Sequence, residues 1–489
     1  MNLSKTLLTL LTLLAVLPSS ASSDLQPRRE FRGAWMHVIF QPQYKDKNPA
    51  QLQAYLRGQL DSLQATGINA ILFQVRPSAD ALYPSRLEPW SRFLTSGGKD
   101  PGWDPLQFMI DETHKRGMEL HAWLNPYRVT TSKDEKLAPG HIYHKEPGRF
   151  VTYADNKIYF DPGLPENRRF IEDVVMDIVS RYDVDGIHFD DYFYPYPVKG
   201  AEFPDDASYK KYGKGMKRDD WRRHNVDLLI EEIHSQIASV KPWVRFGVSP
   251  FGIWRNKKSD PRGSDTNGLQ NYDALYADVL LWSQNGWVDY VIPQLYWVLD
   301  HKLASYIKLN QWWNDNANSR HMYIGQEIQK TMTTPDLPPS TEKSQLRHKI
   351  RLTREAPDIQ GTCWFPAYSI TKNVGGIADS LATSLQSEKA LVPTYPWISS
   401  QRPAPVSSLA SKNGTLSWKA PAPQGKTGDV VRFVIYRLDG DSKDLDRAKI
   451  IAVTPECHYT LTAPGSYVVT ALDRVNNESD MSPIVRIRK

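Results

Sequence analysis

Eight short runs rich in β-branched and aromatic residues recur between residues 30 and 390 of this chain, and the gaps between them are long enough for helices. Within the gaps, apolar residues return at three-and-four spacing, as Ile171, Val174 and Ile178 do, which predicts amphipathic helices. Strand and helix alternating eight times predict an α/β fold of the (β/α)8 TIM-barrel class over residues 30–390, with a doubly wound open sheet as the alternative. The predicted strands are residues 33–40, 70–75, 119–124, 186–191, 245–249, 290–295, 322–325 and 361–365.

The sequence pattern changes after residue 390. Prolines crowd residues 391–405, which we interpret as a linker, and residues 406–489 form short alternating runs broken by Gly, Asn and Asp. This pattern predicts a small all-β sandwich. With Trp418, Tyr436 and Tyr467 in its runs, the tail resembles a fibronectin type III domain, and we assign no chemistry to it.

The first residues have the features of a secretory signal. Lys5 precedes an apolar run from Leu7 to Leu17, and small residues follow this run. We therefore predict a signal peptide at residues 1–22 and an exported, soluble product in the periplasm or outside the cell, with no integral membrane segment after cleavage. No Cys lies near the predicted cleavage zone, so we do not expect a lipoprotein.

Composition argues against several other classes of protein. The formal net charge of +5 is modest and spread along the chain, so we expect no nucleic-acid partner. Cys363 and Cys457 fall in different predicted domains, and we expect no disulfide between them. The histidines lack the paired spacing of a zinc helix and no glycine-rich phosphate loop occurs, so we predict neither a metal nor another cofactor.

The fourth predicted strand ends in two adjacent carboxylates, Asp190 and Asp191, followed at once by aromatic residues. Because side chains alternate along a strand, Asp190 should share the barrel-facing side with His188. A carboxylate at the carboxyl end of a barrel strand lies where barrel enzymes carry out their chemistry. An isolated Asp-Asp pair is more often a helix cap or an ion pair, but this context favours a catalytic role for Asp190.

Cleavage of a glycosidic bond usually needs one carboxyl group to protonate the leaving oxygen and a second to stabilise or attack the sugar. We predict Asp190 as the nucleophile or charge stabiliser. Glu327, just past the seventh strand, is the best-placed candidate acid, with Asp300 less favoured and a solvated loop carboxylate as the alternative interpretation of Glu327. Asp191 should point away from Asp190 unless the strand ends there, and we expect it to bind a hydroxyl group or an arginine.

The ends of the other predicted strands carry polar and aromatic residues that suit a sugar ring, whose C–H face stacks on aromatics while its hydroxyls need donors and acceptors. A single tryptophan is more often core than ligand platform, so the coincidence over several strand ends carries the interpretation. The predicted substrate-binding residues are Arg76, Trp123, Asn125, Tyr127, Arg128, His188, Tyr192, Ser249, Trp254, Gln294, Tyr296, Trp297 and Trp364.

Several of these motifs together resemble the glycosyl-hydrolase-like family 10 barrels of bacteria. The resemblance covers roughly residues 30–390 and includes the segments at residues 31–35, 74–77, 122–128, 185–192 and 292–297. Members of that family include an enzyme that cuts peptidoglycan glycan strands already stripped of stem peptides. The resemblance therefore implies a carbohydrate hydrolase acting on N-acetylated cell-wall glycan, with Asp190 at the catalytic position.

Three functions remain open at this point. The favoured one is an exported glycoside hydrolase whose partners are peptidoglycan glycan strands or a related polysaccharide. A second keeps the enzyme but gives it another polysaccharide, and a third is a non-catalytic glycan-binding barrel. The mechanism is also open, because an N-acetyl group on the sugar could serve as the nucleophile while Asp190 orients it or protonates the leaving group.

Overall fold

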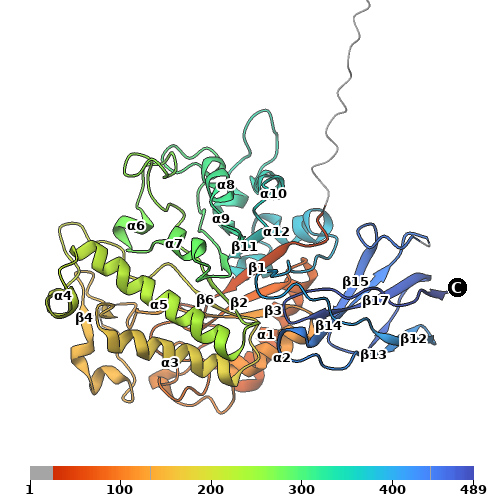
Figure 1. Cartoon of the computed structure of the whole chain (residues 1–489), viewed down its shortest axis with the longest axis horizontal. Coiled ribbons are helices and arrows are strands. Elements are labelled where there is room, and N and C mark those ends of the chain that lie inside the picture. The colour runs from red at the N-terminus through yellow and green to blue at the C-terminus, as the bar shows by residue number, and fades with distance from the viewer. Residues whose placement is uncertain (1–25, 133, 441, 489) are drawn as a thin grey trace, which may run out of the picture.

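The structure is a computed structural model that describes residues 26–132, 134–440 and 442–488. It consists of a large barrel and a smaller sandwich, which lies to the right of the barrel in Figure 1. The predicted signal peptide at residues 1–22 lies outside the described residues. No helix in the described part of the chain combines the length and the apolar character that crossing a membrane requires.

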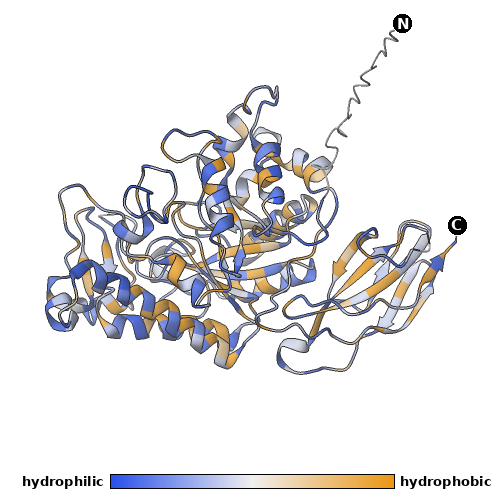
Figure 2. Cartoon of the chain, turned by 45° about the horizontal axis from the view of Figure 1, so that its top comes forward, coloured by the Kyte–Doolittle hydropathy of each residue, from blue (hydrophilic) through white to orange (hydrophobic). Residues whose placement is uncertain are grey.

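The barrel is a parallel sheet with the strand order β10-β11-β1-β2-β3-β6-β7-β8-β9. Its strands carry the hydrophobic residues that form the centre of the molecule (Figure 2). They are β1 (Phe31–Met36), β2 (Ala70–Arg76), β3 (Glu119–Leu124), β6 (Gly186–Phe189), β7 (Arg245–Val248), β8 (Tyr290–Val291), β9 (His321–Met322), β10 (Ile324–Glu327) and β11 (Gly361–Phe365).

The nine strand segments make up the eight strands of a TIM barrel, because β9 and β10 are two halves of one strand interrupted at Tyr323. One half pairs with β8 and the other with β11. The predicted strand 290–295 is shorter than expected, since Pro293 has no N–H to donate to a ladder. Beyond it, Gly325 donates to Pro293 O and Leu295 donates to Gly325 O, both at 2.9 Å, which closes the ring. The predicted TIM barrel is therefore confirmed, and the open-sheet alternative is wrong.

Helices follow the strands and cover the outside of the barrel. Asp104 accepts from Gln107 N at 3.0 Å and Pro105 occupies the first position of α2, so this helix has both an N-cap and a proline start. That helix gives way to Gly117, whose φ of +71° suits glycine. The helices are α1 (Pro49–Ala65), α2 (Pro105–Lys115), α3 (Pro165–Arg181), α4 (Asp206–Tyr212), α5 (Arg218–Val240), α6 (Asn271–Ala274), α7 (Val279–Gln284), α8 (Tyr306–Asp315), α9 (Ile328–Thr333), α10 (Leu346–Glu355), α11 (Ala367–Thr371) and α12 (Ile377–Ser380).

Two long connections rise from the carboxyl ends of β3 and β6. The first contains a short antiparallel pair, β4 (Phe150–Thr152) and β5 (Ile158–Phe160), and the second contains α4. Because both leave the barrel at the same end, they build up one rim of it.

The C-terminal region is a two-sheet antiparallel sandwich, as predicted. One sheet has the order β12-β13-β16 and the other β15-β14-β17-β18. Trp418 and Phe433 pack edge to face between the sheets with ring centroids 5.5 Å apart. Its assignment to the fibronectin type III class stays a prediction. The strands are β12 (Ser407–Lys412), β13 (Thr415–Lys419), β14 (Val430–Arg437), β15 (Lys449–Thr454), β16 (His458–Thr460), β17 (Gly465–Asp473) and β18 (Val485–Ile487).

The sandwich packs against the amino-terminal end of the barrel, opposite the rim formed by the long connections. Arg432 and Asn476 of the sandwich donate to Glu119, the first residue of β3, and Arg28 donates to Glu478. The predicted linker, residues 391–405, is packed into the same junction, where Tyr395 is fully buried. The two domains therefore share an interface rather than being joined by a free segment.

Candidate active site

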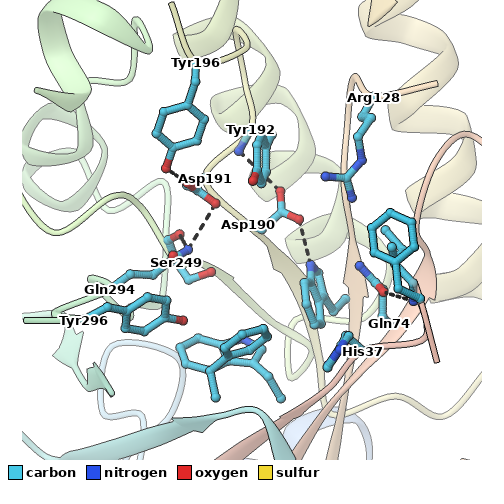
Figure 3. A pocket seen from close by; sticks show the side chains of 15 residues that line it. His37, Gln74, Arg128, Asp190, Asp191, Tyr192, Tyr196, Ser249, Gln294 and Tyr296 are labelled. Carbon is cyan, nitrogen blue, oxygen red and sulfur yellow. Dashed lines mark hydrogen bonds between the residues drawn. The ribbon is translucent and has the colours of Figure 1, made fainter. Parts of the chain in front are cut away.

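A pocket opens at the carboxyl ends of the barrel strands, with a cavity volume of about 370 Å³. This volume falls in the range of small-molecule sites, roughly 300–1,000 Å³. Figure 3 shows the side chains that project into it. The lining residues are Trp35, His37, Ile39, Phe40, Gln74, Trp123, Arg128, Asp190, Asp191, Tyr192, Tyr196, Ser249, Gln294, Tyr296 and Phe365.

Asp190 lines this pocket and is 4 % exposed. Its Oδ2 accepts from Trp123 Nε1 at 3.0 Å, and its Oδ1 accepts from Asn125 Nδ2 at 2.8 Å. The backbone N–H of Tyr192 points to the same Oδ1 at 3.4 Å. Both oxygens of Asp190 therefore face groups that donate hydrogen bonds.

Asp191 lines the same pocket, although strand alternation would have turned it away. The predicted strand runs to residue 191, but β6 ends at Phe189, so the two aspartates belong to the turn that follows. Gln294 Nε2 donates to Asp191 Oδ1 at 3.1 Å, and the Tyr196 hydroxyl donates to Oδ2. Two carboxyl groups from adjacent residues thus enter one cavity (Figure 3).

Burial raises the pKa of both Asp190 and Asp191 above the ordinary aspartate value, and the neighbouring Asp191 raises that of Asp190 further. The nearby Arg128 guanidinium opposes this shift in both groups, and it lies 4.9 Å from the centre of the Tyr192 ring. Two anions this close repel each other, so the pair retains one proton at a pH where an isolated aspartate has lost it.

The hydrogen-bond partners place that proton on Asp191. An indole N–H and an amide NH₂ can only donate, so protonating Asp190 would set an O–H against Trp123 or Asn125. A tyrosine hydroxyl can reverse from donor to acceptor, so Asp191 can carry a proton and keep its bond to Tyr196. These partners favour an anionic Asp190 beside an Asp191 that carries the shared proton.

Aromatic rings surround the two carboxyl groups. Tyr296 and Phe365 stack with centroids 5.9 Å apart, and the rings of Trp35, Trp123 and Tyr192 line the cavity around them. Flat apolar faces next to carboxylate, amide and hydroxyl groups suit a pyranose ring. The arrangement can bind a sugar by stacking while the acids reach its glycosidic bond.

The structure brings part of the predicted binding set together. Six predicted residues line the pocket with the two aspartates: Trp123, Arg128, Tyr192, Ser249, Gln294 and Tyr296. Asn125 and His188 lie directly behind the lining, where Asn125 bonds to Asp190 and His188 bonds to Ser249 at 3.0 Å. These two residues hold lining side chains in place.

Glu327, the sequence-predicted acid, is not among the lining residues. It is the N-cap of α9, where Oε1 accepts from Gln329 N at 2.8 Å and Oε2 from Lys330 N at 2.7 Å. Because α9 begins at Ile328, directly after β10, the carboxylate at this strand end is used to satisfy free helix N–H groups. We therefore correct its placement from the site to a helix cap.

Arg76 is also outside the cavity. It is fully buried in an ion pair with Glu88, with Nη2 and Oε1 2.6 Å apart, and it donates to the carbonyl oxygens of Asn125 and Pro126. Its contacts secure the backbone that presents Asn125 to Asp190. Arg76 thus supports the site from behind and has no access to a ligand.

The structure places four further predicted aromatics away from the cavity. Strand alternation sends Trp364 into the helix-covered core while its neighbour Phe365 reaches the pocket. Tyr127 and Trp254 are buried in the same core, and Trp297 packs on Phe251 with centroids 5.4 Å apart. The rings of Tyr127, Trp254 and Trp364 are structural, because each is buried, and Trp297 is partly buried outside the cavity lining.

Seven lining residues were missed in the predicted set. Alternation along the predicted first strand, residues 33–40, could have found three of them, because Trp35, His37 and Ile39 share the face of Gly33. The other four are on loops or near strand ends whose direction depends on tertiary packing: Phe40, Gln74, Tyr196 and Phe365.

Comparison with known proteins gives consistent results. The family model described as Glycosyl hydrolase-like 10 matches residues 30–338. The glycosyl hydrolase YngK of Bacillus subtilis (strain 168) is 40 % identical over 485 residues, which cover 94 % of each chain. The glycosyl hydrolase DigH of Escherichia coli (strain K12) is 38 % identical over 71 % of this chain and 84 % of its own. Among solved structures, the PgaB glycoside hydrolase domain of Bordetella bronchiseptica is 13 % identical, with a TM-score of 0.47 over 73 % of this chain and 99 % of that domain.

Proposed function

This chain belongs to the glycosyl hydrolase-like 10 family and is a glycoside hydrolase, and on that premise we propose that it is exported and cleaves the N-acetylated glycan strands of bacterial peptidoglycan. In this proposal Asp191 is the general acid and Asp190 the anionic partner. The observation that carries the proposal is the entry of both carboxyl groups into one aromatic pocket with different hydrogen-bond partners.

Asp190 is suited to accept a hydrogen bond from a substrate rather than to attack it. Two of its lone pairs are already used by Trp123 and Asn125, which reduces its strength as a nucleophile. A 2-acetamido sugar brings both an N–H group and a carbonyl oxygen next to its own anomeric carbon. Asp190 accepts from that N–H and turns the carbonyl oxygen toward the anomeric carbon, as in substrate-assisted glycosidases.

The reaction then proceeds in two balanced steps. The acetamide oxygen bonds to the anomeric carbon while the glycosidic C–O bond breaks, and the Asp191 proton passes to the leaving oxygen. This leaves an oxazolinium ion on the sugar, with its N–H bonded to the Asp190 carboxylate, and a carboxylate at Asp191. A water molecule next attacks the anomeric carbon as Asp191 takes its proton, which reopens the acetamide and restores the acid.

Two further features support the location and the substrate. The signal-like residues 1–22 support export to the compartment that contains the cell wall. The long connections after β3 and β6 contribute Arg128, Tyr192 and Tyr196 to the rim of the pocket, which suits a chain that extends beyond one ring.

The test is reducing-end release from a panel that contains intact sacculi, glycan strands freed of stem peptides, de-N-acetylated strands and unrelated polysaccharides. We expect turnover of the N-acetylated strands and a loss of 10²-fold or more in Asp190→Asn and Asp191→Asn, with unchanged circular dichroism. Preferential cleavage of an unrelated polysaccharide would show that peptidoglycan glycan is not the substrate. Glycan binding without turnover in every form would overturn the enzymatic roles of both aspartates.

A further inference from the structure

A chain of polar side chains runs through the barrel interior from the floor of the pocket to the sandwich. His188 Nε2 lies 3.0 Å from Ser249 Oγ, and His188 Nδ1 lies 3.2 Å from the Tyr290 hydroxyl. That hydroxyl is 2.8 Å from His121 Nδ1, and His121 Nε2 is 3.1 Å from Glu119 Oε2. All five residues are buried, so the chain passes through the barrel without a break.

The pocket end of the chain determines the direction of the first bonds. Trp35 Nε1, which can only donate, lies 3.1 Å from His188 Nε2, so that nitrogen is an acceptor. Burial lowers the pKa of His188 well below its ordinary value, so the ring is neutral and its proton is on Nδ1. Nδ1 therefore donates to Tyr290.

The same reasoning gives the direction of the hydrogen bonds toward the amino-terminal end of the barrel. Because the Tyr290 oxygen accepts from His188, its own proton is donated to His121 Nδ1. His121 then has its proton on Nε2 and donates to Glu119. Gly247 leaves room for this arrangement, since a Cβ there would lie 2.2 Å from the Tyr290 ring.

The chain ends on an anion that the sandwich helps to hold. Asn476 Nδ2 donates to Glu119 Oε1 at 2.9 Å, and Arg432 Nη2 donates to the same oxygen at 3.3 Å. Arg245 of the barrel lies 2.6 Å from Glu119 Oε2. Burial opposes a charge here, but Arg245, His121 and Arg432 outweigh it and lower the pKa of Glu119 to about 2. Glu119 therefore remains an anionic acceptor at any physiological pH.

We propose that the C-terminal sandwich is part of the catalytic unit, because its Asn476 and Arg432 complete a one-way hydrogen-bond chain that positions Trp35 and Ser249 in the pocket. The inference rests on the proposed function only in taking that pocket as the catalytic one. His188, Tyr290 and His121 are positioning residues in this chain, since none of them lines the cavity.

The consequence for a sugar is specific. Ser249 Oγ lies 3.0 Å from His188 Nε2, whose lone pair it shares with Trp35, and 3.4 Å from Phe189 O. Both acceptors lie on the inner side, so the Ser249 proton points inward and the lone pairs of its oxygen face the cavity. Ser249 is then an acceptor for a sugar O–H or N–H, and the Trp35 ring is held at a fixed angle by its bond to His188. If the chain were reversed or interrupted, both groups would lose this fixed orientation.

The direct test is the tautomeric state of His188 and His121 in the full-length protein, read from the ring ¹⁵N chemical shifts of histidine-labelled protein. We expect His188 to carry its proton on Nδ1 and His121 on Nε2. The opposite tautomer at His188, or a doubly protonated ring at neutral pH, would overturn the proposal. This measurement needs no substrate, so it is independent of whether peptidoglycan is the glycan cleaved.

A pair of matched variants tests the catalytic consequence. Tyr290→Phe removes the central hydroxyl and keeps the ring, whereas Tyr323→Phe removes an equally buried hydroxyl that bonds to Tyr395 and His321 outside the chain. We expect Tyr290→Phe to lower kcat/KM on glycan strands roughly fivefold, the value of about one hydrogen bond, and to disturb the His188 signal. Equal effects of the two variants would contradict the proposal.

A second pair tests the contribution of the sandwich. Asn476→Ala removes a donor to Glu119, and Arg474→Ala breaks another interdomain contact, the 2.7 Å ion pair with Asp183, without touching the chain. We expect only Asn476→Ala to shift the His121 and His188 ring signals and to lower kcat/KM. If Arg474→Ala has the same effects, the sandwich supports the barrel in general and the proposed role is wrong. If wild type cleaves no glycan, the proposed function fails while the ring signals still decide this inference.

Discussion

Tyr196 donates its hydroxyl hydrogen bond to Asp191, five residues earlier in the chain, so the two adjacent aspartates face different kinds of hydrogen-bond partner. The donors to Asp190 are an indole and an amide, which cannot accept a proton. The protein therefore makes neighbouring residues different through the groups that face them.

Tyr196→Phe should weaken the acid. The Asp191 carboxylate loses a donor, so its pKa rises further, and the alkaline limb of kcat/KM should move to higher pH while kcat falls roughly tenfold. Wild type should show its alkaline limb above the ordinary aspartate pKa, because burial raises the pKa of Asp191. Tyr194→Phe is the control, because the hydroxyl of Tyr194 is buried and has no hydrogen-bond partner among the described residues. A shift of the alkaline limb to lower pH in Tyr196→Phe would contradict this prediction.

Glu327→Ala should affect stability and spare the chemistry. The carboxylate caps α9, so its loss should lower the free energy of unfolding by about 1 kcal/mol. Thermal unfolding and glycan turnover measured on the same preparation check this. A loss of turnover comparable with that of Asp191→Asn would restore Glu327 as the acid.

Phe40→Ala should raise the KM for long substrates more than the KM for short ones. Phe40 is 74 % exposed at the edge of the pocket with a φ of +58°, a backbone conformation that is costly for a bulky residue. Gln74 Oε1 holds the preceding segment through Val38 N at 3.0 Å and Ile39 N at 3.4 Å. We expect a roughly three- to tenfold higher KM on polymeric glycan, with little change on a disaccharide substrate. Leu303→Ala, an exposed apolar residue outside the lining, is the control.

The domain interface should make the protein acid-sensitive. Glu119 has a folded-state pKa of about 2 against an ordinary 4.5, so its stabilisation is complete above pH 4.5 and is lost as the pH falls toward 2. The difference corresponds to about 3 kcal/mol. Calorimetric Tm values across this range should fall more steeply for wild type than for Glu119→Gln. Parallel slopes would show that Glu119 does not titrate as described.

The barrel and the position of Asp190 could be predicted from sequence because both depend on local patterns. Strand and helix periodicities alternate along the chain, and strand alternation puts Asp190 on the barrel-facing side with His188. Asp191 could not be placed in the same way, since its direction depends on β6 ending at Phe189. The two-residue difference between the predicted strand end at residue 191 and the observed end at Phe189 decided whether the pocket had one carboxyl group or two.

Other features depend on contacts between distant segments. Glu327 became a cap because α9 begins directly after β10, and nothing in the local pattern excluded a longer loop there. Trp364 was predicted as a binding residue, but the facing of β11 puts it in the core and puts Phe365 in the pocket. The chain through His188, Tyr290 and His121 joins three separate strands, so its bonds follow only from their register in the sheet.

The most direct test of the account compares two leaving groups in the same variants. An aryl glycoside of an N-acetylated disaccharide with an acidic phenol needs no proton from the enzyme, whereas a glycan strand does. We predict that Asp191→Asn keeps aryl glycoside hydrolysis within about tenfold of wild type and loses glycan cleavage by 10²-fold or more, while Asp190→Asn loses both. Equal losses on both substrates in Asp191→Asn, or aryl glycoside hydrolysis retained in Asp190→Asn, would contradict the assignment of Asp191 as acid and Asp190 as its anionic partner.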